Sequence, residues 1–149
     1  MARISVLFTA VLSLSMTNAV YGADSRQEIN KKIVTEFYEK AINQKDVEAA
    51  MKYLGPKYIQ HNQNAADDAE GLKRFILFLR EKYPNAHSEI KRVFADGDYV
   101  ILHVHAIREP GTRGAAVVDI FRIQEGKIVE HWDVHENISA EPANANGMF

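Results

Sequence analysis

The first half of the chain repeats apolar residues at the spacing of amphipathic helices. Apolar side chains recur every three or four positions between residues 25 and 42, and this period predicts one helix with a broad buried stripe. Ser25 and Glu28 have the spacing of a capping box at its start. Asp46 should cap a shorter second helix, and a third should run from Gly71 to Pro84.

Beyond residue 84 the pattern changes to that of strands. Residues 87–95 and 99–107 flank a turn at residues 96–98, and residues 117–136 have the pattern of a β-hairpin. Residues 58–62 should form a short strand or extended segment between the second and third helices. Two helices, a short strand, a helix and then four antiparallel strands predict an α+β domain, with the helices on one face of a curved, mainly antiparallel sheet.

The predicted hairpin carries acids and histidines among its apolar residues. We expect a three-residue loop, residues 124–126, because a two-residue loop would force Glu125 to positive φ. Asp119 then opposes His131 and Val117 opposes Asp133, which places these side chains on one face. That face should carry Asp119, Phe121, His131, Asp133 and His135, and the other should carry Val118, Ile120, Ile128, Trp132 and Val134.

Composition indicates one ordinary globular domain. The chain has 149 residues, a net charge of −2 and 46% hydrophobic residues, which suffices for a sizeable core. Lysines and arginines are scattered, so no nucleic-acid partner is expected. Cysteine is absent, which excludes thiol catalysis and disulfide bonds.

The N-terminus resembles a secretory signal peptide. Arg3 precedes an apolar run, residues 4–16, and small residues follow at Ala19 and Ala23. Cleavage after Ala19, Gly22 or Ala23 fits this pattern, and we take residues 1–23 as the signal peptide. We predict a mature domain at residues 24–138, an irregular tail at residues 139–149, and a periplasmic or secreted protein without membrane attachment. An uncleaved N-terminal anchor is the alternative, although the run is short for a membrane span.

The same order of elements, with the segments Tyr58–Asn62, Val118–Arg122 and Glu130–Asp133, resembles the SnoaL-like branch of the nuclear transport factor 2-like superfamily. The closing residues 143–149 are similar to the tail of bacterial members of that branch. The resemblance implies a cone-shaped fold with three N-terminal helices, a pocket between helices and sheet, and a homodimer formed through the convex sheet face. The superfamily includes cyclases, isomerases, dehydratases and non-catalytic binders, so the fold alone does not fix the function.

A comparison with ketosteroid isomerase, another member, implies candidate roles. Asp119 falls where that family has its protonated aspartate, and Tyr38 where it has the oxyanion-hole tyrosine. The position of the general base falls on Asn62, beside His61. Because an amide cannot take a proton, steroid isomerisation is disfavoured, and the base would be His61 or a hairpin histidine such as His131.

Each candidate has a structural alternative. Asp119 and His131 fit an acid/base pair, but also an internal salt bridge that pins the hairpin. His61 fits a pocket base or a surface histidine. His103 and His105 share one face of their strand. We expect one to line the pocket and the other to lie near its rim, the alternative being a solvent-facing strip.

His103 and His105 also raise a metal hypothesis. With Gly97 and Glu109 they have the spacing of the first cupin metal motif. The second motif is missing and three leading helices do not fit a jelly roll, so we expect no metal and no cofactor.

Two functions remain open from the sequence. In the first, the pocket binds a small, largely apolar carbonyl or hydroxyl compound. Asp119, His131, His61 and Tyr38 then catalyse isomerisation, aldol-type cyclisation or dehydration, with ligand contacts from Asn62, His103, His105, Phe121, Asp133 and His135. In the second, the same pocket only binds a ligand or a protein. The sequence does not name the substrate.

Overall fold

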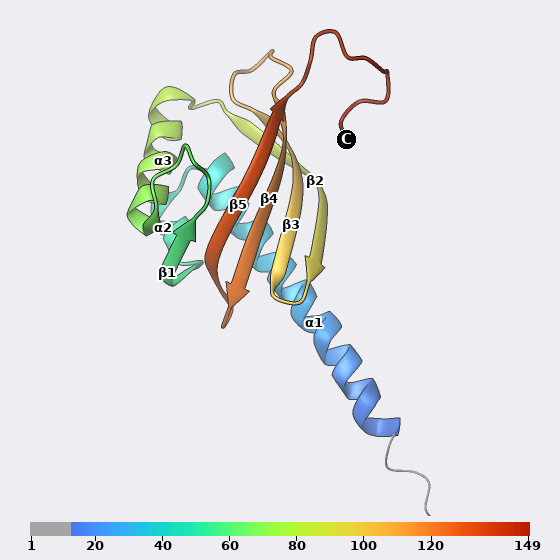
Figure 1. The fold of residues 1–149 in the computed structure, drawn as a ribbon. Helices are drawn as coiled ribbons and strands as arrows, with labels where there is room; N and C mark the ends of the chain where they lie inside the picture. Colours follow the sequence, from blue (N-terminus) through green and yellow to red (C-terminus); the bar gives the residue numbers. More distant parts are fainter. Residues whose placement is uncertain (1–12) are drawn as a thin grey trace, which may run out of the picture.

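The computed structural model describes residues 13–149, as three α-helices, one π-helical segment and five strands (Figure 1). Their order is α1 (Ser13–Tyr38), η1 (Glu39–Asn43), α2 (Val47–Met51), β1 (Leu54–Gln60), α3 (Asp68–Lys82), β2 (His87–Asp96), β3 (Tyr99–Ile107), β4 (Ala115–Gln124) and β5 (Lys127–Asn137). The predicted α+β class and element order are confirmed.

The N-terminal helix begins earlier than the sequence pattern suggested. In the full-length chain α1 already runs from Ser13, so Ser25 lies inside it and the predicted capping box is wrong. The first half of the predicted signal peptide, up to residue 12, lies outside the described residues. Within the described part, no helix is both long and apolar enough to cross a membrane. Asp46 caps α2 as predicted, since its carboxylate accepts the backbone N–H of Ala49 at 3.0 Å.

The five strands form one sheet in the order β1-β5-β4-β3-β2. All neighbours are antiparallel except β1, which runs parallel to β5. Helix α1 crosses one face, which we call the inner face, and α2 and α3 lie at the β1 side (Figure 1). The core lies between this face and the helices, and its fully buried residues include Val34, Ile76, Val100, Leu102, Val104 and Ile128. None of the helices in the described part of the chain covers the opposite, outer face (Figure 1).

The hairpin turn differs from the prediction. Glu125 and Gly126 form a two-residue turn with φ of 53° and 73°, so Gln124 pairs with Lys127. This is the positive-φ geometry that favours glycine or asparagine, and Glu125 adopts it nevertheless. Farther along, Arg122 pairs with Glu130 while Ile123 pairs with Ile128, which makes Val129 the extra residue of a β-bulge.

The bulge changes the partners but keeps the face of the polar residues. Asp119 opposes Asp133 rather than His131, and Phe121 opposes His131. This register differs from the predicted one by two residues, so Asp119, His131 and Asp133 share a face as expected. The prediction for Ile128 was wrong: it was expected on the face opposite to Asp119, but it is fully buried on the inner face.

Candidate active site on the inner face of the sheet

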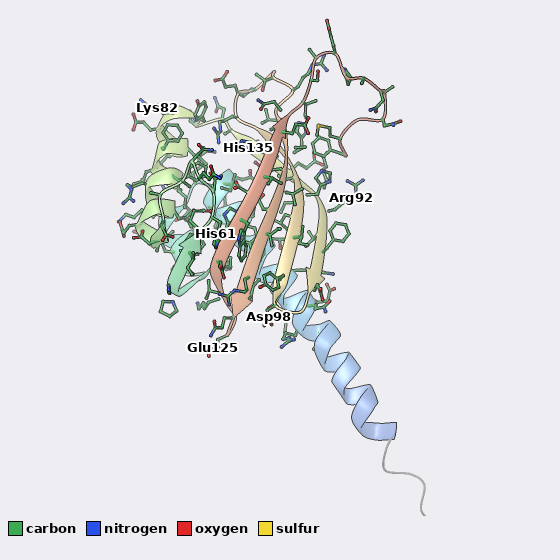
Figure 2. The ribbon with its side chains drawn as sticks, viewed as in Figure 1. His61, Lys82, Arg92, Asp98, Glu125 and His135 are labelled. Atoms are coloured by element: carbon green, nitrogen blue, oxygen red, sulfur yellow. The ribbon has the colours of Figure 1, made fainter. Side chains whose placement is uncertain are left out.

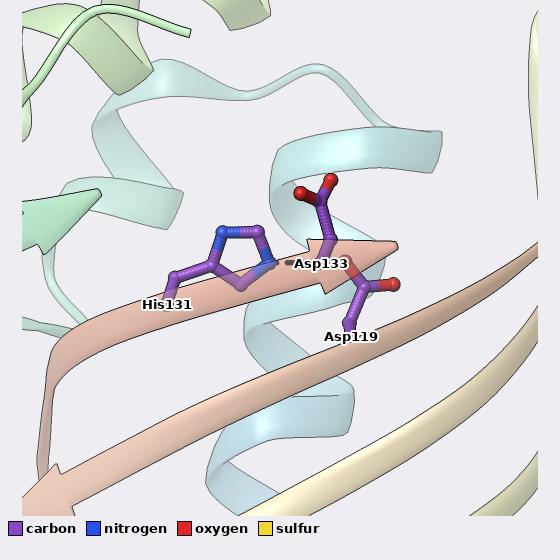
Figure 3. Close-up of side chains that lie close together, drawn as sticks. All are labelled: Asp119, His131 and Asp133. Carbon is purple, nitrogen blue, oxygen red and sulfur yellow. Dashed lines mark hydrogen bonds and ion pairs between the residues drawn. The ribbon is translucent and has the colours of Figure 1, made fainter. Parts of the chain in front are cut away.

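A buried pair of acid and imidazole occupies the inner face of β4 and β5. His131 Nε2 lies 3.0 Å from Asp119 Oδ1, and the two side chains are only 11% and 7% exposed. Figure 3 shows both projecting from neighbouring strands toward the helix behind them. The pair combines two titratable groups in a site of low water access, which is the setting in which proton transfer can be tuned.

The second nitrogen of His131 contacts a residue that the sequence reasoning missed. His131 Nδ1 lies 3.0 Å from Gln60 Oε1, at the end of β1. Gln60 reaches it because β1 pairs in parallel with β5, with Gln60 beside His131 in the register. The alternation Tyr58, Gln60, Asn62 was a usable signal, since every second residue of a strand faces the same way.

Asp133 and Asn62 form a second contact beside the pair. Asn62 Nδ2 donates to Asp133 Oδ2 at 2.8 Å. Asn62, the residue at the position of the general base in ketosteroid isomerase, therefore donates a hydrogen bond to a carboxylate here.

One oxygen of Asp119 has no partner among the described residues that meets hydrogen-bond geometry, although the Tyr38 hydroxyl interacts with this carboxyl. This oxygen, Oδ2, is buried. In Figure 3 this oxygen points away from His131. An unpaired buried acceptor is costly, so such an atom is a natural place for a ligand to donate a hydrogen bond.

Burial raises the pKa of one acid and two phenols of this site. Burial raises the pKa of the Asp119 carboxyl, and the charge of Asp133 adds to this increase. The hydrogen bond and charge of His131 and a hydrogen bond with Tyr38 act to lower it. The pKa of the Tyr38 hydroxyl is raised well above its usual value, first by burial and then by the charge of Asp119. Burial likewise raises the pKa of Tyr58, with the charges of Asp119 and Asp133 adding to it. All three groups are therefore biased toward their protonated forms.

Two phenylalanine rings pack beside the His131–Asp119 pair. The Phe121 ring lies 4.6 Å from the His131 ring and 5.8 Å from that of Phe37, in an edge-to-face contact with the latter. Both phenylalanines are almost fully buried. Two surface depressions lie elsewhere, one beside Tyr53 and one between β1 and the hairpin turn.

His61 does not join this group. Its ring stacks on Trp132 with 4.6 Å between centroids and an interplanar angle of 5°, and its Nε2 lies 2.9 Å from Glu130 Oε1. Arg122 bonds the other oxygen of Glu130 at 2.7 Å. This network lies on the outer face, beside β5 (Figure 2), so the expected position of His61 beside Asp119 and His131 is wrong.

His103 and His105 also lie on the outer face. They alternate with Leu102 and Val104, which are fully buried, and His103 pairs with Val118 rather than with Asp119. His103 Nδ1 contacts Arg92 at 3.0 Å, and His105 Nε2 donates to the carbonyl of Arg113 at 2.8 Å. The expectation that one of them lines the pocket is wrong. His135, at the far end of β5, is exposed (Figure 2).

Ligand atoms able to hold a metal come together at one place in the described part of the chain. Asp119, His131 and Asp133 each offer an atom within 4.8 Å of the others. The cupin-like set of His103, His105 and Glu109 does not gather in this way. In the inner group, His131 Nε2 already contacts Asp119 Oδ1, which makes a proton the simplest occupant between them.

Solved structures share this architecture. A proposed polyketide cyclase from Acidithiobacillus ferrooxidans has a TM-score of 0.60 at 24% identity, covering 72% of this chain and 88% of that one. An uncharacterised cystatin-fold protein from Novosphingobium aromaticivorans has a TM-score of 0.60 at 21% identity, covering 70% and 97%. A proposed ketosteroid isomerase from Kribbella flavida has a TM-score of 0.64 at 15% identity, covering 79% and 85%. These likenesses show the fold.

Sequence comparison identifies the family. A search of curated proteins gave no significant match. The model of the SnoaL-like domain, in contrast, matches residues 34–131, which is more than half of the chain and includes Tyr38, Asp119 and His131. The chain therefore belongs to the SnoaL-like domain family.

Proposed function

We propose that this SnoaL-like domain binds a small, largely apolar carbonyl or hydroxyl compound and moves a proton on it without a cofactor. The observation that carries the proposal is the buried contact of His131 with Asp119, whose second oxygen has no partner of hydrogen-bond geometry among the described residues. A family of this fold suits small-molecule binding, and the solved relatives named as proposed cyclase and isomerase support the reaction class.

Each inner residue has a defined task in this proposal. Asp119 Oδ2 accepts the proton of the bound compound, and His131 takes up the proton held at Oδ1. Tyr38 stays protonated because of its raised pKa, so its hydroxyl can donate to a developing enolate or alkoxide. Phe37 and Phe121 provide the apolar walls. Isomerisation, aldol-type cyclisation and dehydration all require this sequence of proton uptake and return.

The test is a screen of apolar ketones, enones and β-hydroxy ketones, followed by mass spectrometry and NMR of the products. Asp119→Asn should lower turnover by about 10²–10⁴-fold, since general acid–base catalysis contributes that much. The matched control is Glu130→Gln, which alters the His–carboxylate pair on the outer face. Unchanged turnover in Asp119→Asn would remove Asp119 from the mechanism. Binding without turnover in the wild-type protein would favour the alternative of a non-catalytic binding module.

We also propose that the outer face mediates a homodimer. Phe94, Tyr99 and Val134 are large apolar residues on or beside it that are 54%, 43% and 70% exposed. Sedimentation should give a dimer for the wild-type protein and a monomer for Val134→Glu. A monomeric wild-type protein at high concentration would contradict this.

Export is the remaining part of the proposal, and it rests on the N-terminal sequence pattern. Expression of the full-length chain with its native N-terminus in a bacterial host should give a mature protein in the periplasm or medium that begins near residue 24. N-terminal sequencing measures the cleavage position, and recovery of the intact chain from the cytoplasm would contradict export.

A further inference from the structure

The orientation of the Gln60 amide is determined by its neighbours. Gln60 Oε1 accepts the backbone N–H of Asn62 at 2.9 Å, and Gln60 Nε2 donates to the Tyr58 hydroxyl at 3.1 Å. A backbone N–H is only a donor, so the atom facing it must be the amide oxygen. The reversed amide would place two donors against each other.

This orientation determines which nitrogen of His131 carries hydrogen. Gln60 Oε1 is 3.0 Å from His131 Nδ1, and an amide oxygen can only accept. Nδ1 must therefore be protonated, whatever the charge of the ring. The other nitrogen, Nε2, faces Asp119 Oδ1 at 3.0 Å. One proton lies between these two atoms, either on Asp119 beside a neutral ring or on Nε2 beside a carboxylate.

We propose that Gln60 is a positioning residue: it holds the proton of His131 on Nδ1 and so leaves Nε2 to share a single proton with Asp119. Its catalytic consequence rests on the proposed function. With Nδ1 protonated and the shared proton on Asp119, the ring is an acceptor toward Asp119. When Asp119 Oδ2 takes a proton from the bound compound, the proton at Oδ1 passes to Nε2. The products are the substrate anion, a protonated Asp119 and an imidazolium, so charge and protons balance.

Without Gln60, the Nε2–H tautomer of the neutral His131 ring becomes more favourable than the Nδ1–H tautomer. Gln60→Leu removes the acceptor of Nδ1–H, and a buried N–H without a partner is costly. The proton shared with Asp119 then sits on Nε2, which donates to the Asp119 carboxylate, while the Nδ1 proton is released to solvent. Nε2 can then no longer receive a proton. Gln60→Glu keeps an oxygen acceptor for Nδ1–H and should preserve the wild-type tautomer. The exposed Gln63 provides the matched control, Gln63→Leu.

The experiment is two-bond ¹H–¹⁵N NMR of the histidine rings, which reads the tautomer without any substrate. We expect His131 in the Nδ1–H form in the wild-type protein, in Gln60→Glu and in Gln63→Leu, and in the Nε2–H form in Gln60→Leu. A wild-type neutral ring protonated on Nε2 overturns the proposal even if the leucine variant fails to fold. So does a folded leucine variant with an unchanged tautomer.

Turnover separates this proposal from the proposed function. With a substrate in hand, Gln60→Leu should lower kcat by about 10²–10⁴-fold, the size of an acid–base contribution, and Gln60→Glu should restore most of it. A tautomer that switches while no variant of Gln60 or Asp119 affects any turnover leaves the positioning role intact and refutes the catalytic function.

Discussion

Two histidine–carboxylate pairs lie on opposite faces of the same sheet, and they differ in environment far more than in geometry. The inner pair, His131 with Asp119, is separated by 3.0 Å, and the outer pair, His61 with Glu130, by 2.9 Å. The inner side chains are 11% and 7% exposed, whereas the outer ones are 40% and 16% exposed. The two pairs therefore differ in burial and in the groups around them, and hardly in the distance between acid and ring.

The pKa of the acid is shifted in opposite directions in the two pairs. In the inner pair burial is the largest influence and raises the pKa of Asp119. In the outer pair the hydrogen bond from His61 is the largest influence and, with Arg122, lowers the pKa of Glu130. The same pair of residue types thus gives a proton-holding site on one face and an ordinary surface ion pair on the other.

The largest contrast should come from removing each histidine. His131→Ala leaves the buried Asp119 without its partner, and breaking a buried pair in this way costs about 3–5 kcal/mol of unfolding free energy. His61→Ala should cost about 1 kcal/mol or less, as is usual for an exposed ion pair. Urea unfolding followed by circular dichroism measures both. Equal losses would show that burial does not separate the two pairs.

The aromatic neighbours of the two pairs should differ in the same direction. Phe121 is almost fully buried beneath His131, so Phe121→Ala should cost about 3 kcal/mol through the cavity it leaves. Trp132 stacks on His61 at the half-buried outer face, and Trp132→Ala should cost about 1–2 kcal/mol. Urea midpoints, with the slope checked for constancy, provide the measurement. A larger loss for Trp132→Ala would indicate that the outer face is covered in solution.

The sequence predicted the layers of this fold better than the details of its turns. Periodicity gave the helices and strands in their observed order, because burial of one helix stripe and of alternate strand residues is imposed along the whole element. The predicted turn at Glu125 was wrong because the conformational preference of one residue for negative φ contributes less to stability than the pairing of the flanking strands. The bulge at Val129 has no sequence signal, yet the face of Asp119 and His131 was right because the register error was two residues.

For the candidate site, histidines received too much weight in the prediction. His61 attracted attention because imidazole titrates near neutral pH, but neighbours on a strand point to opposite faces, so His61 and Asn62 could not both face inward. Gln60 was overlooked because an amide does not titrate. Its contact with His131 depends on the parallel pairing of β1 with β5, which joins segments about seventy residues apart and cannot be read from local pattern.

The two acids should give opposite dependences of stability on pH. Asp119 binds its proton more tightly in the folded state, so its contribution is greatest at low pH and is lost as the pH rises through the raised pKa. Glu130 binds its proton less tightly when folded, so its contribution is present above its unfolded pKa and is lost as the pH falls through the lowered one.

Urea midpoints between about pH 3 and about pH 8 test this contrast. Asp119→Asn should reduce the loss of stability on raising the pH, and Glu130→Gln should reduce the loss on lowering it. Identical pH profiles for the two variants would contradict the opposite shifts.

The smallest effect on stability should come from removing the C-terminal Phe149, which packs on the outer histidines His103 and His105. The Phe149 ring lies 4.7 Å from His105 and 5.2 Å from His103, with Lys91 Nζ 5.6 Å from its centroid. The tail returns toward β2 and β3 in Figure 1. Because Phe149 is 36% exposed, Phe149→Ala should cost only about 0.5 kcal/mol of unfolding free energy.

Loss of the Phe149 ring current in this variant should nevertheless shift the ring protons of His103 and His105 in NMR spectra, while those of His61 stay fixed. Asn144→Ala is the control within the tail. A shift at His61, or none at His105, would mean that the tail does not rest on this part of the sheet, and the outer face would then be as open around His105 as it is around His61.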